Sequence, residues 1–166
     1  MNEWVERFHR FLGEPDGASN PEAVREMGRQ LGADLPEELV QVLAAYGDRE
    51  YAEQVVLFGP RLLESENFDN PTELMRAVGE SESRPRLPSV DGLLVWGEST
   101  ASDIYALRHF GGRWAVSAYD GQNHQWIDFN DGFADWLYVA LEANPGFEMF
   151  PIYTDETPYE SVKIVS

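Results

Sequence analysis

The sequence predicts an α+β fold, in which N-terminal helices pack against a mainly antiparallel β-sheet that an amphipathic helix closes. Apolar residues recur at helical spacing in the first third of the chain, whereas short apolar runs separated by glycine-containing turns fill residues 93–129. Connections this short favour antiparallel neighbours, because a parallel crossover needs about a dozen residues or more. Helices grouped before a run of strands are typical of α+β proteins.

Three helices are expected before residue 48. The first has apolar residues at i, i+4, i+7 and i+8, namely Trp4, Phe8, Phe11 and Leu12. In the second, Asn20 can cap the helix and Pro21 suits its first position, while Gly32 follows its end. The third begins at Leu35-Pro36 and ends at Gly47, with apolar residues on one face.

The region from residue 48 to residue 92 is predicted to mix short elements. Residues 55–58 form an apolar strand that Gly59-Pro60 ends, and Leu62-Leu63 can continue the sheet. A short helix is expected from Asn70-Pro71 to Gly79. The charged segment 80–89, which contains two prolines, is predicted to be an exposed loop that connects layers of one domain.

Four strands and a helix are predicted between Leu93 and Leu141. The strands are expected at residues 93–96, 104–110, 114–119 and 126–129, with glycine-bearing turns at 97–102, 111–112, 120–121 and 130–132. The helix that follows has its apolar face formed by Phe133, Trp136, Leu137, Ala140 and Leu141. Residues 147–153 and 162–165 can add edge strands.

Length and composition predict one cytoplasmic domain spanning residues 1–166. The chain is long enough to bury a sizeable core. No run approaches the roughly 20 consecutive apolar residues of a membrane span, and the first residues lack the basic and apolar regions of a signal peptide. Cysteine is absent, which excludes disulfides and thiolate metal sites.

The formal net charge of −18 bears on the choice of partner. Such a field repels nucleic acid and anionic lipid, and it attracts a cationic partner. After Arg113 the only basic residue is Lys163, so the C-terminal part is especially poor in cations. Solubility, or an acidic host proteome, explains the charge equally well, and both alternatives stay open at this point.

The sequence predicts no catalytic residue, no cofactor-binding residue and no metal ligand. Residues 97–101 are like a nucleophile elbow, but Ala101 replaces the required glycine and a strand follows, so Ser99 is expected to be a turn hydroxyl. Residues 128–132 lack the glutamate that closes an EF-hand loop. The three histidines are not at ligand spacing. Trp96, Trp114 and Trp136 are predicted to lie in the core.

The order of the motifs resembles the SUKH superfamily, the domain shared by fungal cell-wall-synthesis regulators and many bacterial immunity proteins. The motifs are Leu35-Pro36-Glu37-Glu38-Leu39, Tyr46-Gly47, Leu93-Leu94-Val95-Trp96-Gly97, Asp103-Ile104-Tyr105, Trp114-Ala115-Val116, Trp126, and Phe133-Ala134-Asp135-Trp136-Leu137. The resemblance covers roughly residues 20–152. The chain departs from the pattern at Ser102, where glycine is common, and at Leu107, where an aromatic residue is common.

The resemblance implies an immunity protein that binds and neutralises a cognate bacterial toxin by stoichiometric protein–protein interaction, without catalysis. Acidic groups would oppose a cationic active-site cleft in the toxin, such as that of a nuclease, while aromatic residues anchor the contact. The candidate contact residues are Glu98, Tyr119, Asp120, His124, Trp126, Asp128 and Asp131. The alternative is a general protein-interaction or regulatory domain of the cell-wall-synthesis-regulator type, without a toxin partner.

Overall fold

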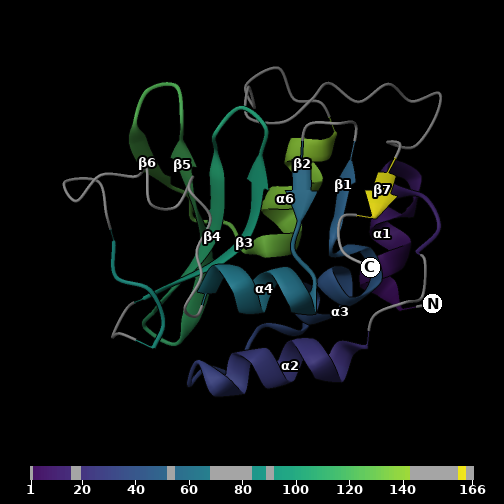
Figure 1. The fold of residues 1–166 in the computed structure, drawn as a ribbon, viewed down its shortest axis with the longest axis horizontal. Helices are drawn as coiled ribbons and strands as arrows, with labels where there is room; N and C mark the ends of the chain where they lie inside the picture. Colours follow the sequence, from purple (N-terminus) through teal and green to yellow (C-terminus); the bar gives the residue numbers. More distant parts are fainter. Residues whose placement is uncertain are drawn as a thin grey trace.

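The computed structural model describes residues 2–15, 20–51, 55–67, 84–88, 92–142 and 161–163 of the chain. Within these residues seven strands form one sheet, in the order β6-β5-β4-β3-β2-β1-β7, and all its neighbouring strands are antiparallel (Figure 1). The α+β prediction is therefore confirmed. The strands are β1 (Arg49–Tyr51), β2 (Val55–Leu57), β3 (Leu93–Ser99), β4 (Ile104–Phe110), β5 (Arg113–Asp120), β6 (Gln125–Asp128) and β7 (Ser161–Lys163).

The three predicted N-terminal helices are present as α1 (Glu3–Leu12), α2 (Pro21–Gln30) and α3 (Glu37–Tyr46). Asn20 caps α2 as expected, because its side-chain oxygen accepts a 2.8 Å hydrogen bond from the backbone N–H of Glu22. The Tyr46 hydroxyl at the end of α3 donates to the carbonyl oxygen of Gly13, 2.9 Å away. This bond ties the end of α3 to the end of α1.

Helix α6 (Phe133–Leu141) forms the centre of the core with β3 and β4. Trp96 on β3 contacts Phe133 and Trp136 of α6 edge-on, with ring centroids 4.9 and 5.8 Å apart, and stacks on Tyr105 of β4 at 5.4 Å. All four side chains are buried. Trp96 and Trp136 are thus core residues as predicted, whereas Trp114 is only partly buried and packs against His109 at a tilt, with ring centroids 4.5 Å apart.

Helix α4 (Pro60–Asn67) replaces the strand predicted at Leu62-Leu63, so that prediction was wrong. Its first turn is capped from a distant position, because the carboxylate of Asp48 accepts hydrogen bonds from the backbone N–H groups of Gly59, Arg61 and Leu62. Figure 1 shows α4 in front of the sheet and α6 behind it. The short strand β1, which immediately follows Asp48, was not predicted from the sequence.

The predicted meander is confirmed with small changes in its boundaries. Strand β3 continues to Ser99 instead of ending at Trp96, with a bulge between Val95 and Gly97, so the turn that follows is shorter than expected. Strand β7 confirms part of the edge strand predicted at 162–165. The helix predicted at 70–79, the edge strand predicted at 147–153 and most of the loop predicted at 80–89 lie outside the described residues.

Candidate functional site

The candidate site lies on the hairpin of β5 and β6, at one edge of the described sheet. Tyr119 of β5 and Trp126 of β6 are direct cross-strand partners, and their ring centroids are 5.4 Å apart. Tyr119 is buried and Trp126 is half-buried. The turn between them places Nδ1 of His124 3.4 Å from the Tyr119 hydroxyl. The hairpin thereby brings together three of the predicted contact residues.

Glu98 belongs to the same row of side chains across the sheet. The register pairs Glu98 with Ile104, Ile104 with Tyr119, and Tyr119 with Trp126, so the four share the face opposite α6. Burial raises the pKa of the Glu98 carboxyl to about 7, and the negative charge of Glu66 on α4 adds to this effect. At neutral pH Glu98 therefore contributes less negative charge than the sequence suggested.

Asp120 is the turn residue of the hairpin. Its carboxylate accepts hydrogen bonds from the backbone N–H groups of Gln122 and Asn123 and from the side chain of Asn123. The bond from the Asn123 side chain lowers the pKa of Asp120, and the two backbone bonds act in the same direction. Asp120 therefore stays ionised at neutral pH.

A second turn supports the hairpin from the side of β3 and β4. The buried carboxyl of Asp103 accepts hydrogen bonds from the Ser99 hydroxyl at 2.8 Å and from the Gly121 N–H at 2.9 Å. Gly121 is packed against Ser102 so closely that a Cβ atom would lie 2.2 Å from the Ser102 carbonyl oxygen. Ser102 itself has φ of 71°, the left-handed conformation that favours glycine.

Asp128 is held in a network that the sequence did not reveal. Ser117 Oγ donates to its carboxylate at 2.7 Å, and Nη1 of Arg84 lies 2.6 Å from the same oxygen. Nη1 of Arg108 lies 3.7 Å away. Burial by itself would raise the pKa of Asp128, but the bonds from Arg84 and Ser117 and the two positive charges lower it.

Arg84 and Arg108 are the site residues that sequence reasoning missed. Arg84 also lies over the Trp126 ring, with its guanidinium carbon 5.2 Å from the ring centroid. Arg108 donates to the backbone carbonyls of Val116 and Phe129 and to Ser117 Oγ, which fixes its position. The predicted meander places Arg108 on a strand next to β5, so its contact with β5 could have been found from the sequence. Arg84 is 44 residues from Asp128, and no sequence pattern near it indicates this contact.

Asp131 does not join the other predicted residues. It follows the C-terminal end of β6, whereas His124 precedes the N-terminal end of that strand. Its backbone oxygen accepts a 2.9 Å hydrogen bond from Val116, which positions the entry to α6. The structure therefore gathers six of the seven candidates on β3, β5, β6 and the β5–β6 turn, and places Asp131 apart from them.

The remaining groups considered for chemistry have structural partners. Ser99 Oγ accepts hydrogen bonds from the backbone N–H groups of Ala101 and Asp103, at 3.2 Å each, and donates to the Asp103 carboxylate. Ser99 is thus the turn hydroxyl that the sequence favoured. Across the described parts of the chain, no group of three or more histidine and carboxylate side chains is arranged to hold a metal ion.

Comparison with family models, with curated proteins and with solved structures finds no match for this chain. Among the helices that the structure describes, none combines the length and the apolar character needed to cross a membrane. The functional assignment therefore depends on the residues of the chain itself.

Proposed function

We propose that this protein is a cytoplasmic immunity protein, which binds a cognate bacterial toxin stoichiometrically and occludes its active site. The observation that carries the proposal is the half-buried Trp126, an aromatic side chain at the sheet edge that the buried Tyr119 holds in place and that Asp120 and Asp128 flank. Aromatic anchors of this kind dominate the energetics of protein–protein contacts. The order of sequence motifs, which resembles the SUKH superfamily, adds support from an independent direction.

In the proposed mechanism, the hairpin of β5 and β6 enters a cationic cleft of the toxin. A standard interface buries roughly 1,600 Å² in total, which one face of a domain of this size can supply. Asp120 is ionised and partly exposed where β5 enters the hairpin turn, so it can pair with a cation of the cleft. The net charge of −18 would raise the rate of association with such a partner.

The proposal is tested by sequencing the genes beside this one and co-expressing the protein with any toxin that they encode. The wild-type protein should rescue growth and bind the purified toxin at a one-to-one ratio. Trp126→Ala should weaken binding by roughly 30-fold or more, because a central aromatic anchor contributes about 2 kcal/mol or more. Glu26→Ala, on the exposed face of α2 and remote from the hairpin, is the matched control and should leave binding unchanged.

Two outcomes would count against the proposal. If no toxin gene adjoins this gene and no rescue occurs, a general protein-interaction or regulatory domain becomes the better interpretation. If rescue occurs but Trp126→Ala and Glu26→Ala bind the toxin equally well, the binding surface lies elsewhere on the molecule. If the affinity for the toxin hardly changed between low and high salt, only the proposed electrostatic attraction would be excluded.

A further inference from the structure

The contact between Arg84 and the β5–β6 hairpin has the composition of an arginine-recognition site. The guanidinium of Arg84 lies over the ring of Trp126, and one of its nitrogens is 2.6 Å from Oδ1 of Asp128. An aromatic face beside a carboxylate satisfies a guanidinium in two ways at once, by cation–π attraction and by a charged hydrogen bond. The planar guanidinium stacks on such a face better than the compact ammonium of lysine does.

The receiving side of this contact is rigidly built. Ser117 is completely buried and donates to Asp128 Oδ1 at 2.7 Å, so the carboxylate is oriented whether or not Arg84 is present. The Trp126 ring packs against Tyr119, which is 4% exposed and therefore fixed in the sheet. Preorganisation of this kind reduces the entropy cost of binding a ligand.

The Arg84 side of the contact is open to exchange. The Arg84 side chain is 33% exposed and that of Asp128 is 44% exposed, so the ion pair lies at the surface. An ion pair this exposed contributes little to stability, typically less than about 1 kcal/mol. Arg108, by contrast, is 17% exposed and donates to two backbone carbonyls, so it is a fixed part of the sheet.

We propose that Trp126 and Asp128, with Ser117 behind them, bind an arginine side chain of a protein partner, and that Arg84 occupies this site in the unbound chain. A partner arginine would displace Arg84 and take over the same ring and the same carboxylate. The exchange keeps the charge around Asp128 constant, because one guanidinium replaces another. This inference rests on the proposed function, since it names the partner group that the hairpin recognises.

The tethered Arg84 acts as an internal competitor. A competitor within the same chain has a high effective concentration at its site, and the apparent affinity for an external ligand falls in proportion to the fraction of open sites. Removing the Arg84 side chain should therefore unmask the site for a ligand as small as a single arginine in a peptide.

The test uses the full chain and an acetylated, amidated Gly-Gly-Arg-Gly-Gly peptide. Binding is measured by calorimetry and by the shift of the Trp126 indole N–H resonance, assigned with Trp126→Phe. Arg84→Ala should bind the peptide roughly three- to sixfold more tightly than the wild type, because an ion pair of less than about 1 kcal/mol keeps at most about five sites in six closed. Arg84→Gln provides a second variant without the positive charge, with a side chain longer than that of alanine. Arg113→Ala, which removes the same charge from the neighbouring strand β5, is the matched control and should behave as the wild type.

Two further comparisons establish the chemistry of the site. A peptide with citrulline in place of arginine has nearly the same shape without the charge and should not bind Arg84→Ala. Adding Asp128→Asn to Arg84→Ala should abolish binding of the arginine peptide. The proposal is overturned if Arg84→Ala does not bind the arginine peptide, if wild type and Arg113→Ala bind it as tightly, or if citrulline or Asp128→Asn makes no difference.

The two proposals fail separately. If the peptide binds as expected but the protein rescues no cell from a neighbouring toxin, the arginine site stands and the immunity function does not. If the toxin is neutralised and Trp126→Ala weakens its binding, while the peptide does not bind Arg84→Ala, the immunity function stands and the arginine site is excluded.

Discussion

Glu98 carries a carboxyl group whose ionisation is opposed by its position in the sheet. It lies between Val56 and Ile104 in the register, and Glu66 on α4 contributes a like charge. Burial is the larger cause and Glu66 the smaller, and together they raise the pKa of Glu98 from its ordinary value of 4.5 to about 7. The protein therefore stabilises the neutral form of this carboxyl group.

The raised pKa predicts a loss of stability as the pH rises. Between pH 4.5 and about 7 the folded chain holds a proton on Glu98 that the unfolded chain has released, so the free energy of unfolding falls with pH in this window. In the wild type the free energy of unfolding should fall by about 1–3 kcal/mol across this window, a range that allows for the partial exposure of Glu98. In Glu98→Gln this decrease should be absent. The free energy of unfolding of both proteins is measured in urea from pH 4 to 8. Parallel curves for the two proteins would contradict the assignment.

The tryptophans show what a single residue does and does not reveal in the sequence. Trp96 and Trp136 lie at apolar positions of a strand and of a helix, and both are completely buried as predicted. Trp114 also lies on a strand, but it precedes the first buried residue of β5 and packs at a tilt against His109 at the surface. Sequence pattern gives the face on which a residue lies, whereas its depth depends on which elements cover that face.

At the scale of elements, the sequence predicted those whose signals are local. Helices α2 and α3 carry their own start and stop residues, and the hairpins β4–β5 and β5–β6 both turn at glycine residues. Helix α4 was mistaken for a strand because part of its N-terminal cap comes from Asp48, eleven residues before Gly59. The same holds for the candidate site. The Tyr119–Trp126 pair could be predicted from the meander, whereas Arg84 comes from a segment outside the meander and could not.

Asn67 is the residue that docks α4 on the sheet. Strand β2 ends at Leu57, so it does not pair with β3 as far as Val95. The side-chain amide of Asn67 takes its place, accepting from the Val95 N–H and donating to the Val95 carbonyl, both at 2.8 Å. The amide thus imitates the peptide group of a neighbouring strand, at a position that is almost fully buried.

Replacing this amide should therefore loosen α4. Asn67→Leu keeps a similar volume but leaves the buried N–H and C=O of Val95 without their partner, and the expected loss is roughly 2–4 kcal/mol of unfolding free energy. Amide hydrogen exchange should also quicken in α4 before the rest of the protein. Asn130→Leu, an equivalent change in an exposed turn, is the control. A loss below 0.5 kcal/mol for Asn67→Leu, roughly the scale of surface substitutions, would exclude this role.

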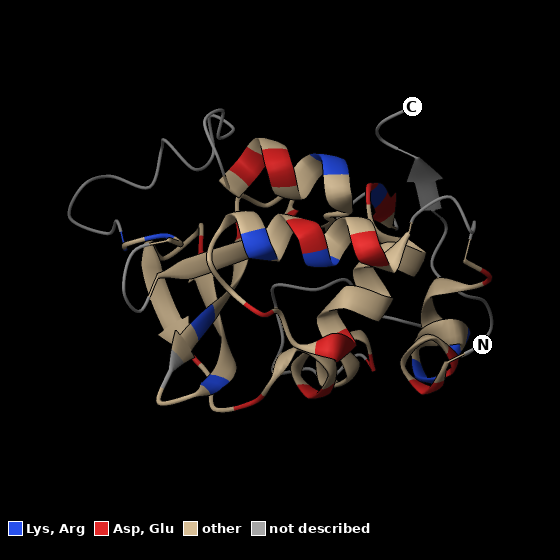
Figure 2. Cartoon of the chain, turned by 90° about the horizontal axis from the view of Figure 1, so that it is seen from below, with Lys and Arg blue, Asp and Glu red and all other residues tan. Residues whose placement is uncertain are grey.

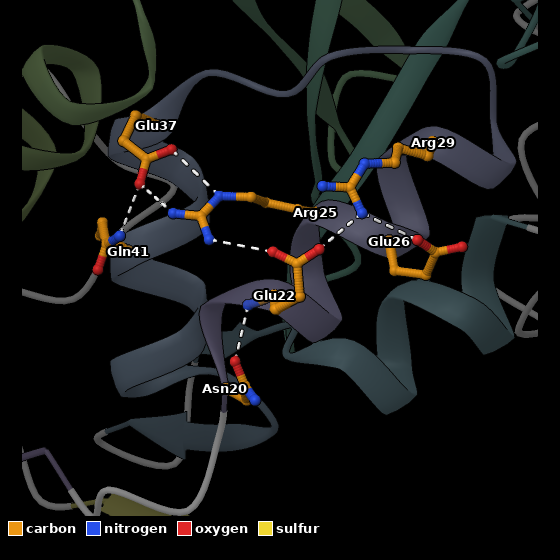
Figure 3. Close-up of polar contacts among 7 residues, drawn as sticks. All are labelled: Asn20, Glu22, Arg25, Glu26, Arg29, Glu37 and Gln41. Carbon is orange, nitrogen blue, oxygen red and sulfur yellow. Dashed lines mark hydrogen bonds and ion pairs between the residues drawn. The ribbon is translucent and has the colours of Figure 1, made fainter.

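At the scale of the whole molecule, acidic and basic side chains are spread over the surface, and the acidic ones outnumber the basic ones that could pair with them. Figure 2 shows Asp and Glu interspersed with Arg on the helices. On α2 and α3 these residues form a surface network: Arg25 joins Glu22 to Glu37, and Arg29 joins Glu22 to Glu26 (Figure 3). The side chains concerned are 34–55% exposed, so each pair contributes little.

The excess of 18 negative charges should therefore affect the salt dependence of stability more than these ion pairs do. Self-repulsion destabilises the compact state, and salt screens it over a Debye length that shortens from about 30 Å at 0.01 M to a few ångströms near 1 M.

Raising sodium chloride from 10 mM to 0.5 M should accordingly increase the free energy of unfolding in urea by about 1–2 kcal/mol. The double variant Glu64→Gln/Asp131→Asn removes two exposed negative charges and should respond less steeply, because there is less repulsion left to screen. Potassium chloride should give the same slope, since ionic strength and not the particular cation is responsible. A free energy that decreased with salt would mean instead that the network on α2 and α3 governs stability, and Arg25→Gln, which removes two of its four ion pairs, would then reduce the decrease.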